Sequence, residues 1–281
     1  MAAKTTKRSR SPKKRTLDEW ERGWQQHWSK TSSSSYELPI NGPGGADREF
    51  LTQARTPEKE TARLKRIHDE FVRGFEGLYQ LGPAVTVFGS ARFKPTHAYY
   101  KLARAVGGEL ARAGFATLTG GGPGIMEAAN RGAHEAGGTS YGLNIILPHE
   151  QSANPYVDKT VEFHYFFTRK VMLVKYSCAF IVMPGGLGTL DEMFEAATLV
   201  QCGKIGPFPI VLMGVKFWEG MRRWGRFMMK QGVFSKEEIG FGWVTDSPTE
   251  AVEVILRSLP ATVRNQLKPR DGKRSHRVRS K

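Results

Sequence analysis

Most of the chain alternates short apolar runs with longer stretches in which apolar residues recur every three or four positions. The short runs are typical of buried strands, and the longer stretches are typical of amphipathic helices. Strands that alternate with helices in this way form βαβ units, whose strands are parallel. We therefore expect an α/β fold, with a doubly wound parallel sheet and helices on both of its faces. The predicted strands are Ala84–Phe88, Ala116–Leu118, Ser140–Leu147, Ala179–Met183 and Pro209–Met213, and the predicted helices cover roughly 96–113, 125–136, a stretch from about 168, a stretch from about 189, 216–231 and 248–259.

One more helix is predicted ahead of the sheet. Thr56 is suited to cap its N-terminus, and Pro57 is suited to its first position. Apolar residues then repeat at helical spacing until Gly82 and Pro83 end the pattern. The repeating residues are Leu64, Ile67, Phe71, Phe75 and Leu78.

The two ends of the chain differ in composition from the rest. Trp20, Trp24 and Trp28 recur at a four-residue spacing, so on a helix they would share one face and would dock on the body or on a second subunit. The flanking segments lack the apolar residues that a core needs. We expect a basic, largely disordered extension with a Trp-bearing helix over 1–55, the amphipathic helix over 56–82, the α/β domain over 83–260, and a basic disordered tail over 261–281.

The net charge of +15 resides almost entirely in these two ends. Residues 1–16 carry +7 and residues 261–281 carry +7, which leaves about +1 for the 244 residues between them. A nearly neutral body gives no reason to expect that it binds nucleic acid. The tails leave two interpretations open, namely salt-sensitive contact with nucleic acid or another polyanion, and solvated segments that keep the protein soluble.

The sequence has none of the patterns that are typical of membrane-spanning, secreted, disulfide-linked or metal-binding proteins. No apolar run is long enough to span a bilayer, and the basic start is not followed by the apolar region of a secretory signal. Cys178 and Cys202 cannot form a disulfide framework, and no cysteine or histidine spacing resembles a metal site. We therefore expect a cytoplasmic protein that does not enter a membrane and holds no metal.

Glycine-rich turns follow three of the predicted strands, at Gly89, at Gly120–Gly124 and at Gly185–Gly188. A glycine turn that opens a helix presents backbone N–H groups to an anion. Because the carboxyl ends of parallel strands lie at one edge of a sheet, the three turns should converge on one crevice. Neither of the two longer turns has the lysine of a phosphate-binding P-loop or the glycine spacing of a dinucleotide site. Glycine is also common at tight turns for steric reasons alone, but two such turns together favour an anion site.

Charged residues beside the last turn have two interpretations. Thr189 and Glu192 have the spacing of a capping box, in which Glu192 would only satisfy the start of its own helix. Alternatively, Glu192 faces the crevice and takes part in chemistry. Arg169 and Lys170 stand near the start of another helix, where cations oppose the helix dipole, so they would bind phosphate, pair with the acids or lie in solvent.

Two further residues are open to both kinds of interpretation. Ser90 follows the first strand and would either donate its hydroxyl to a ligand or cap the next helix. Glu127 lies one turn into the helix that follows Gly124, where it would face a ligand or stabilise the helix start.

The sequence around the last turn resembles the LOG ("lonely guy") family, once labelled lysine decarboxylases. Residues 184–192 read PGGLGTLDE and match the PGGxGTxxE signature of that family. Arg169, 23 residues before Glu192, matches the family's arginine-to-glutamate spacing. Residues 120–126 read GGGPGIM and are similar to the family's other glycine-rich turn, although one residue shorter than the plant-type version. The resemblance covers about 83–260 and implies a Rossmann-like domain.

The resemblance implies hydrolysis of the N-glycosidic bond of a nucleoside 5′-monophosphate, such as AMP or an N6-substituted cytokinin riboside monophosphate, with no cofactor. It makes Arg169 and Glu192 the catalytic pair. It also implies a homo-oligomer, for which the helices around Leu64–Leu78 and Phe217–Met229 are candidate contacts. A non-catalytic nucleotide- or cofactor-binding module on the same fold is the alternative. The residues expected to hold the substrate are Ser90, Gly121, Gly122, Lys170, Gly185, Gly186, Gly188 and Thr189, with Gly185, Gly186, Gly188 and Thr189 on the phosphate.

Overall fold

The structure is a computed structural model that describes residue 22 and residues 55–146, 153–206, 208–235 and 242–269. The basic stretches 1–16 and 270–281 and the three N-terminal tryptophans lie outside these residues. The chain divides into two units, Met1–Ala54 and Arg55–Lys281. The fold described below is that of the second unit.

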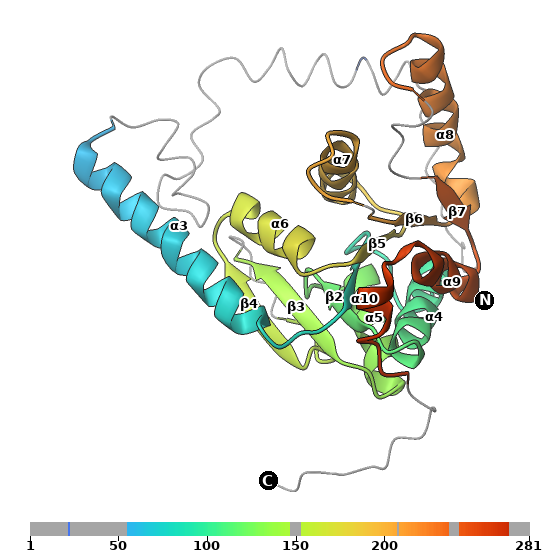
Figure 1. The fold of residues 1–281 in the computed structure, drawn as a ribbon, viewed down its shortest axis with the longest axis horizontal. Coiled ribbons are helices and arrows are strands. Elements are labelled where there is room, and N and C mark those ends of the chain that lie inside the picture. The colour runs from blue at the N-terminus through green and yellow to red at the C-terminus, as the bar shows by residue number, and fades with distance from the viewer. Residues whose placement is uncertain (1–21, 23–54, 147–152, 207, 236–241, 270–281) are drawn as a thin grey trace, which may run out of the picture. The chain divides into compact units, whose positions relative to one another are not determined.

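Seven parallel strands form one sheet in the order β4-β3-β2-β1-β5-β6-β7 (Figure 1). From β1 the chain adds strands in one direction as far as β4, and it then returns to the other side of β1 for β5 to β7. The sheet is therefore doubly wound, which confirms the expected α/β fold class. The strands are β1 Ala84–Phe88, β2 Ala116–Thr119, β3 Ser140–Ile145, β4 Lys159–Phe163, β5 Ala179–Val182, β6 Ile210–Met213 and β7 Trp243–Thr245.

The strand order reverses between β1 and β5. These strands pair directly, with Val85 opposite Ala179 and Phe88 opposite Val182. In open α/β sheets, ligands bind beyond the carboxyl ends of the strands at such a reversal. The fold therefore places the candidate site next to the segments that follow Phe88 and Val182.

Helices connect and flank the strands. Thr56 caps α3 as expected, with its Oγ1 accepting from the N–H of Lys59 at 3.4 Å, and Pro57 begins the helix. Among the described helices, none is long and apolar enough to cross a membrane. The helices are α3 Pro57–Leu78, α4 Ala98–Arg112, α5 Ile125–Glu135, α6 Phe166–Lys175, α7 Leu187–Gln201, α8 Val215–Lys230, α9 Pro248–Ser258 and α10 Ala261–Arg264.

Two clusters of buried apolar residues lie on opposite faces of the sheet. Alternate residues of β1 belong to different clusters, with Val85 and Val87 in one and Ala84 and Phe88 in the other. The first cluster includes residues of α4, α5 and α9, and the second includes residues of α3, α6 and α7. All five residues of β1 are buried, which explains why its sequence, AVTVF, does not alternate between apolar and exposed polar residues; its one polar side chain, Thr86, is hydrogen-bonded to Ser177.

One strand and one domain boundary differ from those expected from the sequence. β4 was not predicted, because Lys159, Thr160 and Glu162 are exposed on this edge strand and interrupt any apolar run. The α/β domain also continues beyond residue 260, the end that the sequence pattern predicts for it. It includes α10, and Val263 and Leu267 pack against the cluster that α4 and α9 share.

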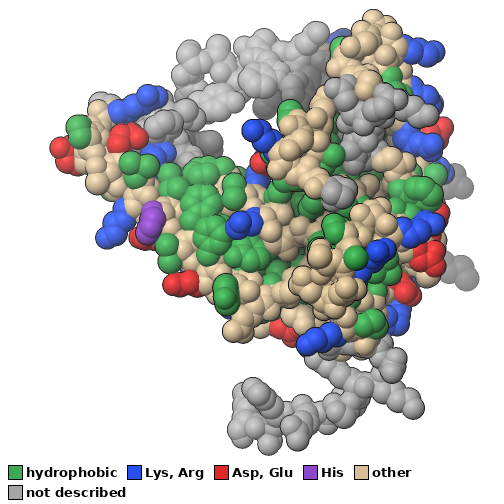
Figure 2. All heavy atoms as spheres, viewed as in Figure 1, with side chains coloured by type: hydrophobic (Ala, Val, Ile, Leu, Met, Phe, Trp, Pro, Cys, Tyr) green, Lys and Arg blue, Asp and Glu red, His purple; other side chains and the backbone are tan. Residues whose placement is uncertain are grey.

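Figure 2 shows hydrophobic side chains gathered over α3 and α6. We call this region the α3–α6 apolar surface. Only part of the apolar face of α3 is used for packing, since Leu78 is fully buried whereas Leu64 remains 66% exposed. The exposed apolar residues of the surface are Leu64, Val72, Phe75 and Tyr79 of α3 and its end, and Phe166, Phe167 and Val171 of α6.

Candidate active site

A pocket of about 720 Å³ lies at the carboxyl ends of β1, β2 and β5. Residues from all three glycine-rich turns line it, so the predicted convergence on one crevice is confirmed. Arg169 and Glu192 also line it, from α6 and α7 respectively. The lining consists of Phe88, Gly89, Ser90, Ala91, Arg92, Gly120, Met126, Arg169, Leu173, Gly186, Leu187, Gly188, Thr189 and Glu192.

The N-terminus of α7 opens into this pocket. Gly186 is the N-cap residue, and as a glycine it has no side chain with which to cap this end. The N–H groups of Leu187 and Gly188 stand at the first two helical positions, where the helix itself offers no acceptor. They are therefore available to an anion in the pocket, where the helix dipole adds a favourable field.

Two glycines at this helix start are not required by the fold. A Cβ on Gly186 or Gly188 would meet no atom within 4 Å, and neither residue has a positive φ. Glycine in a helix costs about 0.5–1 kcal/mol relative to alanine. This cost applies to Gly188, the second residue of α7, and no packing or backbone constraint explains it there, whereas Gly186 is at the N-cap, where glycine is tolerated. We infer that Gly188 leaves room for a ligand.

The capping-box interpretation of Glu192 is wrong. α7 begins at Leu187 rather than at Thr189, so Glu192 is the sixth helical residue and lies beyond the first turn. The N–H of Thr189 donates to the carbonyl of Gly186 at 3.0 Å. Glu192 is therefore not engaged in satisfying the helix start, and its carboxylate is available to the pocket.

Glu192 forms an ion pair with Arg169. The Arg169 Nη2 donates to Glu192 Oε1 at 3.1 Å, and the two side chains are only 13% and 6% exposed. Arg169 Nε is buried without a hydrogen-bond partner in the described structure. A buried pair of this kind is costly to form unless further polar partners arrive, as a bound anion would provide.

Burial changes the pKa of both partners. It raises the pKa of Glu192 to about 7, against the opposing effects of the positive charges on Arg169 and Lys170. It lowers the pKa of Arg169, whereas the negative charge of Glu192 acts in the other direction. A carboxyl group that titrates near neutral pH in a pocket is suited to proton transfer.

Comparison with known proteins connects this geometry to a family. The chain is 32% identical over 170 residues to the cytokinin riboside 5′-monophosphate phosphoribohydrolase of Mycobacterium tuberculosis, covering 89% of that protein and 58% of this chain. The Mycobacterium marinum protein of the same name is 30% identical over 162 residues, with 87% of it and 57% of this chain covered. This chain belongs to the LOG family.

A family model and a plant relative agree with that assignment. A family model described as "Possible lysine decarboxylase" matches residues 126–255. The rice LOG protein is 32% identical over 130 residues, which cover 52% of it and 45% of this chain. Among solved structures, the molybdenum cofactor binding protein of Rippkaea orientalis is 25% identical, with a TM-score of 0.45 over 96% of that chain and 63% of this one.

Some residues of the LOG signature line the pocket, and another shapes the turn beside it. Gly186, Gly188 and Thr189 line the pocket, whereas Gly185 does not. A Cβ on Gly185 would lie 2.1 Å from Thr189 Oγ1, so this glycine allows the turn to fold back on the helix start.

Lys170 is placed differently from the expected substrate ligand. It is absent from the pocket lining, and its Nζ pairs with Asp191 at 3.0 Å and with Glu195 at 2.6 Å. Lys170 therefore links α6 to the outer side of α7. This link helps to hold Arg169 and Glu192, on the same two helices, at a fixed separation.

Gly121 and Gly122 are also placed differently from the expected substrate ligands. Both are buried and neither lines the pocket. The side-chain amide of Asn154 donates to their carbonyls at 3.0 and 3.1 Å, and it also donates to Asn130 at 3.0 Å. This turn is therefore occupied by the protein's own polar groups.

Ser90 lies in the pocket and also supports it. Its Oγ accepts from the N–H of Arg92 at 3.1 Å, and its backbone bonds both to Pro184 and to Ile125. Ser90 thus ties the segment after β1 to both of the longer glycine turns. Glu127, in contrast, does not reach the pocket, because it accepts from the Tyr100 hydroxyl at 2.6 Å.

Sequence reasoning missed several lining residues, including Arg92, Met126 and Leu173. Arg92 follows the Gly89 turn by three residues, and that position was the available signal. Met126 and Leu173 lie on the inner faces of α5 and α6, where a lining residue has the same apolar pattern as a core residue. Among the described residues, no group of three or more histidine, cysteine or acidic side chains could hold a metal ion.

Proposed function

We propose that this protein hydrolyses the N-glycosidic bond of a nucleoside 5′-monophosphate, releasing the base and ribose 5-phosphate. The observation that carries the proposal is the pairing of an open helix N-terminus with the buried Arg169–Glu192 pair in a single pocket. The names of the relatives support a cytokinin riboside 5′-monophosphate, an N6-substituted AMP, as the substrate. We include unsubstituted AMP in the proposal because it has the same sugar phosphate and the same glycosidic bond.

The 5′-phosphate would bind at the start of α7. The N–H groups of Leu187 and Gly188 would donate to it, and the missing side chains of Gly186 and Gly188 leave room for its oxygens. A phosphate held here anchors the sugar, so its binding energy can be used at the reacting carbon. Apolar lining from Met126 and Leu173 would provide a surface for the flat base.

Glu192 would act on the anomeric carbon. Cleavage of a glycosidic bond passes through an oxocarbenium-like state, which a nearby carboxylate stabilises. In its ionised form Glu192 would also accept a proton from the attacking water. Arg169, through Nη2, would hold the carboxylate in position, and its unpartnered Nε would donate to the substrate.

Release of the base tests this proposal. We expect the full chain to release adenine from AMP, and to do so far more slowly from adenosine, because adenosine lacks the phosphate. Glu192→Gln should lower kcat by at least about 1,000-fold, because it removes the carboxylate but little of the phosphate site. Chromatography of the free base and calorimetric titration of ribose 5-phosphate provide the two readouts.

The matched control is Glu253→Gln, which removes an exposed carboxylate on α9 and should leave kcat unchanged. Saturable binding of AMP without release of base by the wild-type protein would instead support a non-catalytic binding module. Turnover by Glu192→Gln at the wild-type rate would remove Glu192 from the mechanism.

The dependence of activity on pH gives a second test. If the ionised form of Glu192 is required, kcat/KM rises with pH through the pKa of about 7 and then levels off. Below that pKa the slope should be about tenfold per pH unit. A rate profile that falls as pH rises through this range would mean that the protonated carboxyl is the active form.

We further propose that the protein is a cytoplasmic homo-oligomer whose subunits meet on the α3–α6 apolar surface. This surface adjoins the site, since the Phe166 ring lies 5.2 Å from the Arg169 guanidinium carbon. Cys178 and Cys202 are both free, which agrees with a reducing compartment. Light scattering on the full chain tests the assembly, and the mass of a monomer would contradict it.

A further inference from the structure

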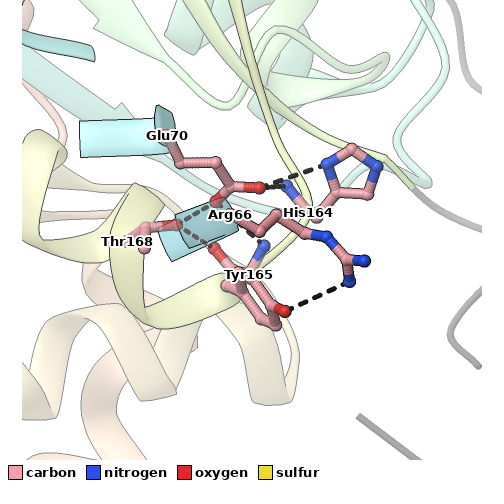
Figure 3. Close-up of polar contacts among 5 residues, drawn as sticks. All are labelled: Arg66, Glu70, His164, Tyr165 and Thr168. Atoms are coloured by element: carbon pink, nitrogen blue, oxygen red, sulfur yellow. Dashed lines mark hydrogen bonds and ion pairs between the residues drawn. The ribbon is translucent and has the colours of Figure 1, made fainter. Parts of the chain in front are cut away.

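A carboxylate with no exposed surface lies between α3 and α6. Glu70, in the middle of α3, is 0% exposed. Figure 3 shows its carboxylate directed at the segment that leads into α6. Oε1 accepts from the N–H of His164 at 2.7 Å, and Oε2 accepts from the N–H of Tyr165 at 3.3 Å and from the Thr168 hydroxyl at 2.6 Å.

These contacts anchor the N-terminus of α6 by accepting from the N–H of its N-cap residue and from the N–H of the residue before it. Tyr165 is the N-cap residue of that helix and makes no side-chain capping bond of its own. The carboxylate that caps α6 therefore comes from a different helix, and its negative charge also lies at the positive end of the α6 dipole. α6 has only ten residues, so its stability depends on such tertiary contacts.

Further contacts hold α3 and α6 together around this carboxylate. Arg66 Nη1 donates to the Tyr165 hydroxyl at 3.3 Å, and His164 Nδ1 lies 3.1 Å from Glu70 Oε1. One turn further along α3, Gly74 allows the Met172 side chain to approach within 3.0 Å of the place where a Cβ would be. α3 therefore fixes both the start and the middle of α6.

α6, which α3 holds in this way, carries Arg169, the residue that follows Thr168. We propose that Glu70 is a positioning residue for catalysis, which fixes the N-terminus of α6 so that Arg169 meets Glu192 in the pocket. A role of Glu70 in catalysis rests on the proposed function. Its effect on the position of Arg169 beside Glu192 can be tested without measuring turnover. α3 lies outside residues 126–255, the part that the family model matches.

A carboxylate is suited to this position in a way that an apolar side chain is not. Removing a carboxylate from water costs several kcal/mol unless hydrogen-bond donors surround it. Glu70 has such donors, all of them from residues 164–168. Substitution by glutamine would place an amide N–H₂ opposite the backbone N–H of His164 or of Tyr165, neither of which can accept a hydrogen bond, so it should loosen the start of α6 while keeping the size of the side chain.

The ionisation of Glu192 reports on the position of Arg169. The charged groups that act on Glu192 are Arg169 and Lys170, which lower its pKa, and Asp191 and Glu195, which raise it. If Arg169 moves away, the pKa of Glu192 must rise. A helix that is merely less stable overall, but correctly placed when folded, would leave that pKa unchanged.

The experiment compares Glu70→Gln with Glu76→Gln, a matched variant at an exposed position of the same helix. Carbon-detected NMR titration of the glutamate carboxyl groups, with Glu192→Gln used to assign the signal, measures the pKa of Glu192 in each folded protein. We expect Glu70→Gln to raise this pKa by about 0.5 or more and Glu76→Gln to leave it unchanged. In the base-release assay, Glu70→Gln should lower kcat by about tenfold or more, with a smaller change in KM.

An unchanged pKa of Glu192 in folded Glu70→Gln would overturn the inference, whatever the activity. If wild-type protein releases no base but the pKa still rises, the proposed function fails and the positioning relationship stands. If Glu70→Gln does not fold, Thr168→Val, which removes one donor to Glu70, decides instead. It should raise the pKa of Glu192, whereas Thr168→Ser, which keeps the hydroxyl, should restore the wild-type value.

Discussion

Two glycine-rich turns follow strands of the same sheet, one after β2 and one after β5, and their glycines serve different purposes. In the turn after β2, Gly121 has a φ of +73°, and a Cβ there would lie 2.0 Å from Asn144 Oδ1. The carbonyls of Gly121 and Gly122 are bonded to Asn154. Gly121 is therefore needed by the fold itself, and the carbonyls of Gly121 and Gly122 are already engaged, although Gly120 of the same turn lines the pocket.

The turn after β5 shows the opposite arrangement. Gly186 and Gly188 are exposed, have ordinary φ values and have empty space where their side chains would be. Arg169 and Glu192 lie beside this turn in the same pocket. From this difference we infer that Gly186 and Gly188 after β5, which the fold does not require, leave room for a ligand.

The largest effect is expected in the turn after β2. Gly121→Ala should lower the free energy of unfolding by about 2–4 kcal/mol, because the new side chain meets Asn144 and the backbone conformation is unfavourable for alanine. Chemical denaturation measures this change. Activity per folded molecule should fall little, since Gly121 does not line the pocket.

Gly82→Ala is the control that measures the loss of stability caused by placing alanine at a positive φ alone. Gly82 has a φ of +71° but no atom within 4 Å of its Cβ position, so its loss of stability should be clearly smaller. Equal destabilisation by the two substitutions would show that the contact with Asn144 contributes nothing.

A smaller effect, and one on binding instead of stability, is expected in the turn after β5. Gly188→Ala should raise the Kd for ribose 5-phosphate by about 10- to 100-fold, because the methyl group occupies space proposed for the phosphate. The same change should stabilise the protein slightly, by about 0.5–1 kcal/mol, because alanine favours the helix. Calorimetric titration and thermal unfolding give the two values.

Gly220→Ala, in α8, is the matched control, because Gly220 also has nothing within 4 Å of its Cβ position and does not line the pocket. It should increase stability without weakening binding. If Gly188→Ala binds ribose 5-phosphate with the Kd of the wild type, that result contradicts the proposal that the turn after β5 holds the phosphate.

Much of the fold could be predicted from the sequence, because strands buried on both faces consist mainly of apolar and β-branched residues and glycines mark the ends of several of them. The position of the site followed from the same pattern, since the carboxyl ends of parallel strands share one edge. The start of α7 was predicted two residues late. A glycine-rich turn contains no capping side chain that would mark it, and this error made the capping-box interpretation of Glu192 plausible.

The differing purposes of the glycines could not be predicted, because they depend on residues distant in the chain. Asn154 lies 33 residues beyond Gly121, and nothing in the local pattern connects them. The contacts of Glu70 span 94 to 98 residues. One signal was available, since Glu70 shares the four-residue spacing of the buried Gly74 and Leu78 and is thus an acid on the buried face of a helix.

The most direct test of the central claim is a crystal structure of the Glu192→Gln protein with AMP. We predict that the phosphate lies against the N–H groups of Leu187 and Gly188, with the glycosidic carbon beside residue 192 and with Arg169 in contact with the nucleotide. A phosphate bound in the turn of Gly120–Gly124, or a nucleotide bound away from residue 192, would contradict the account.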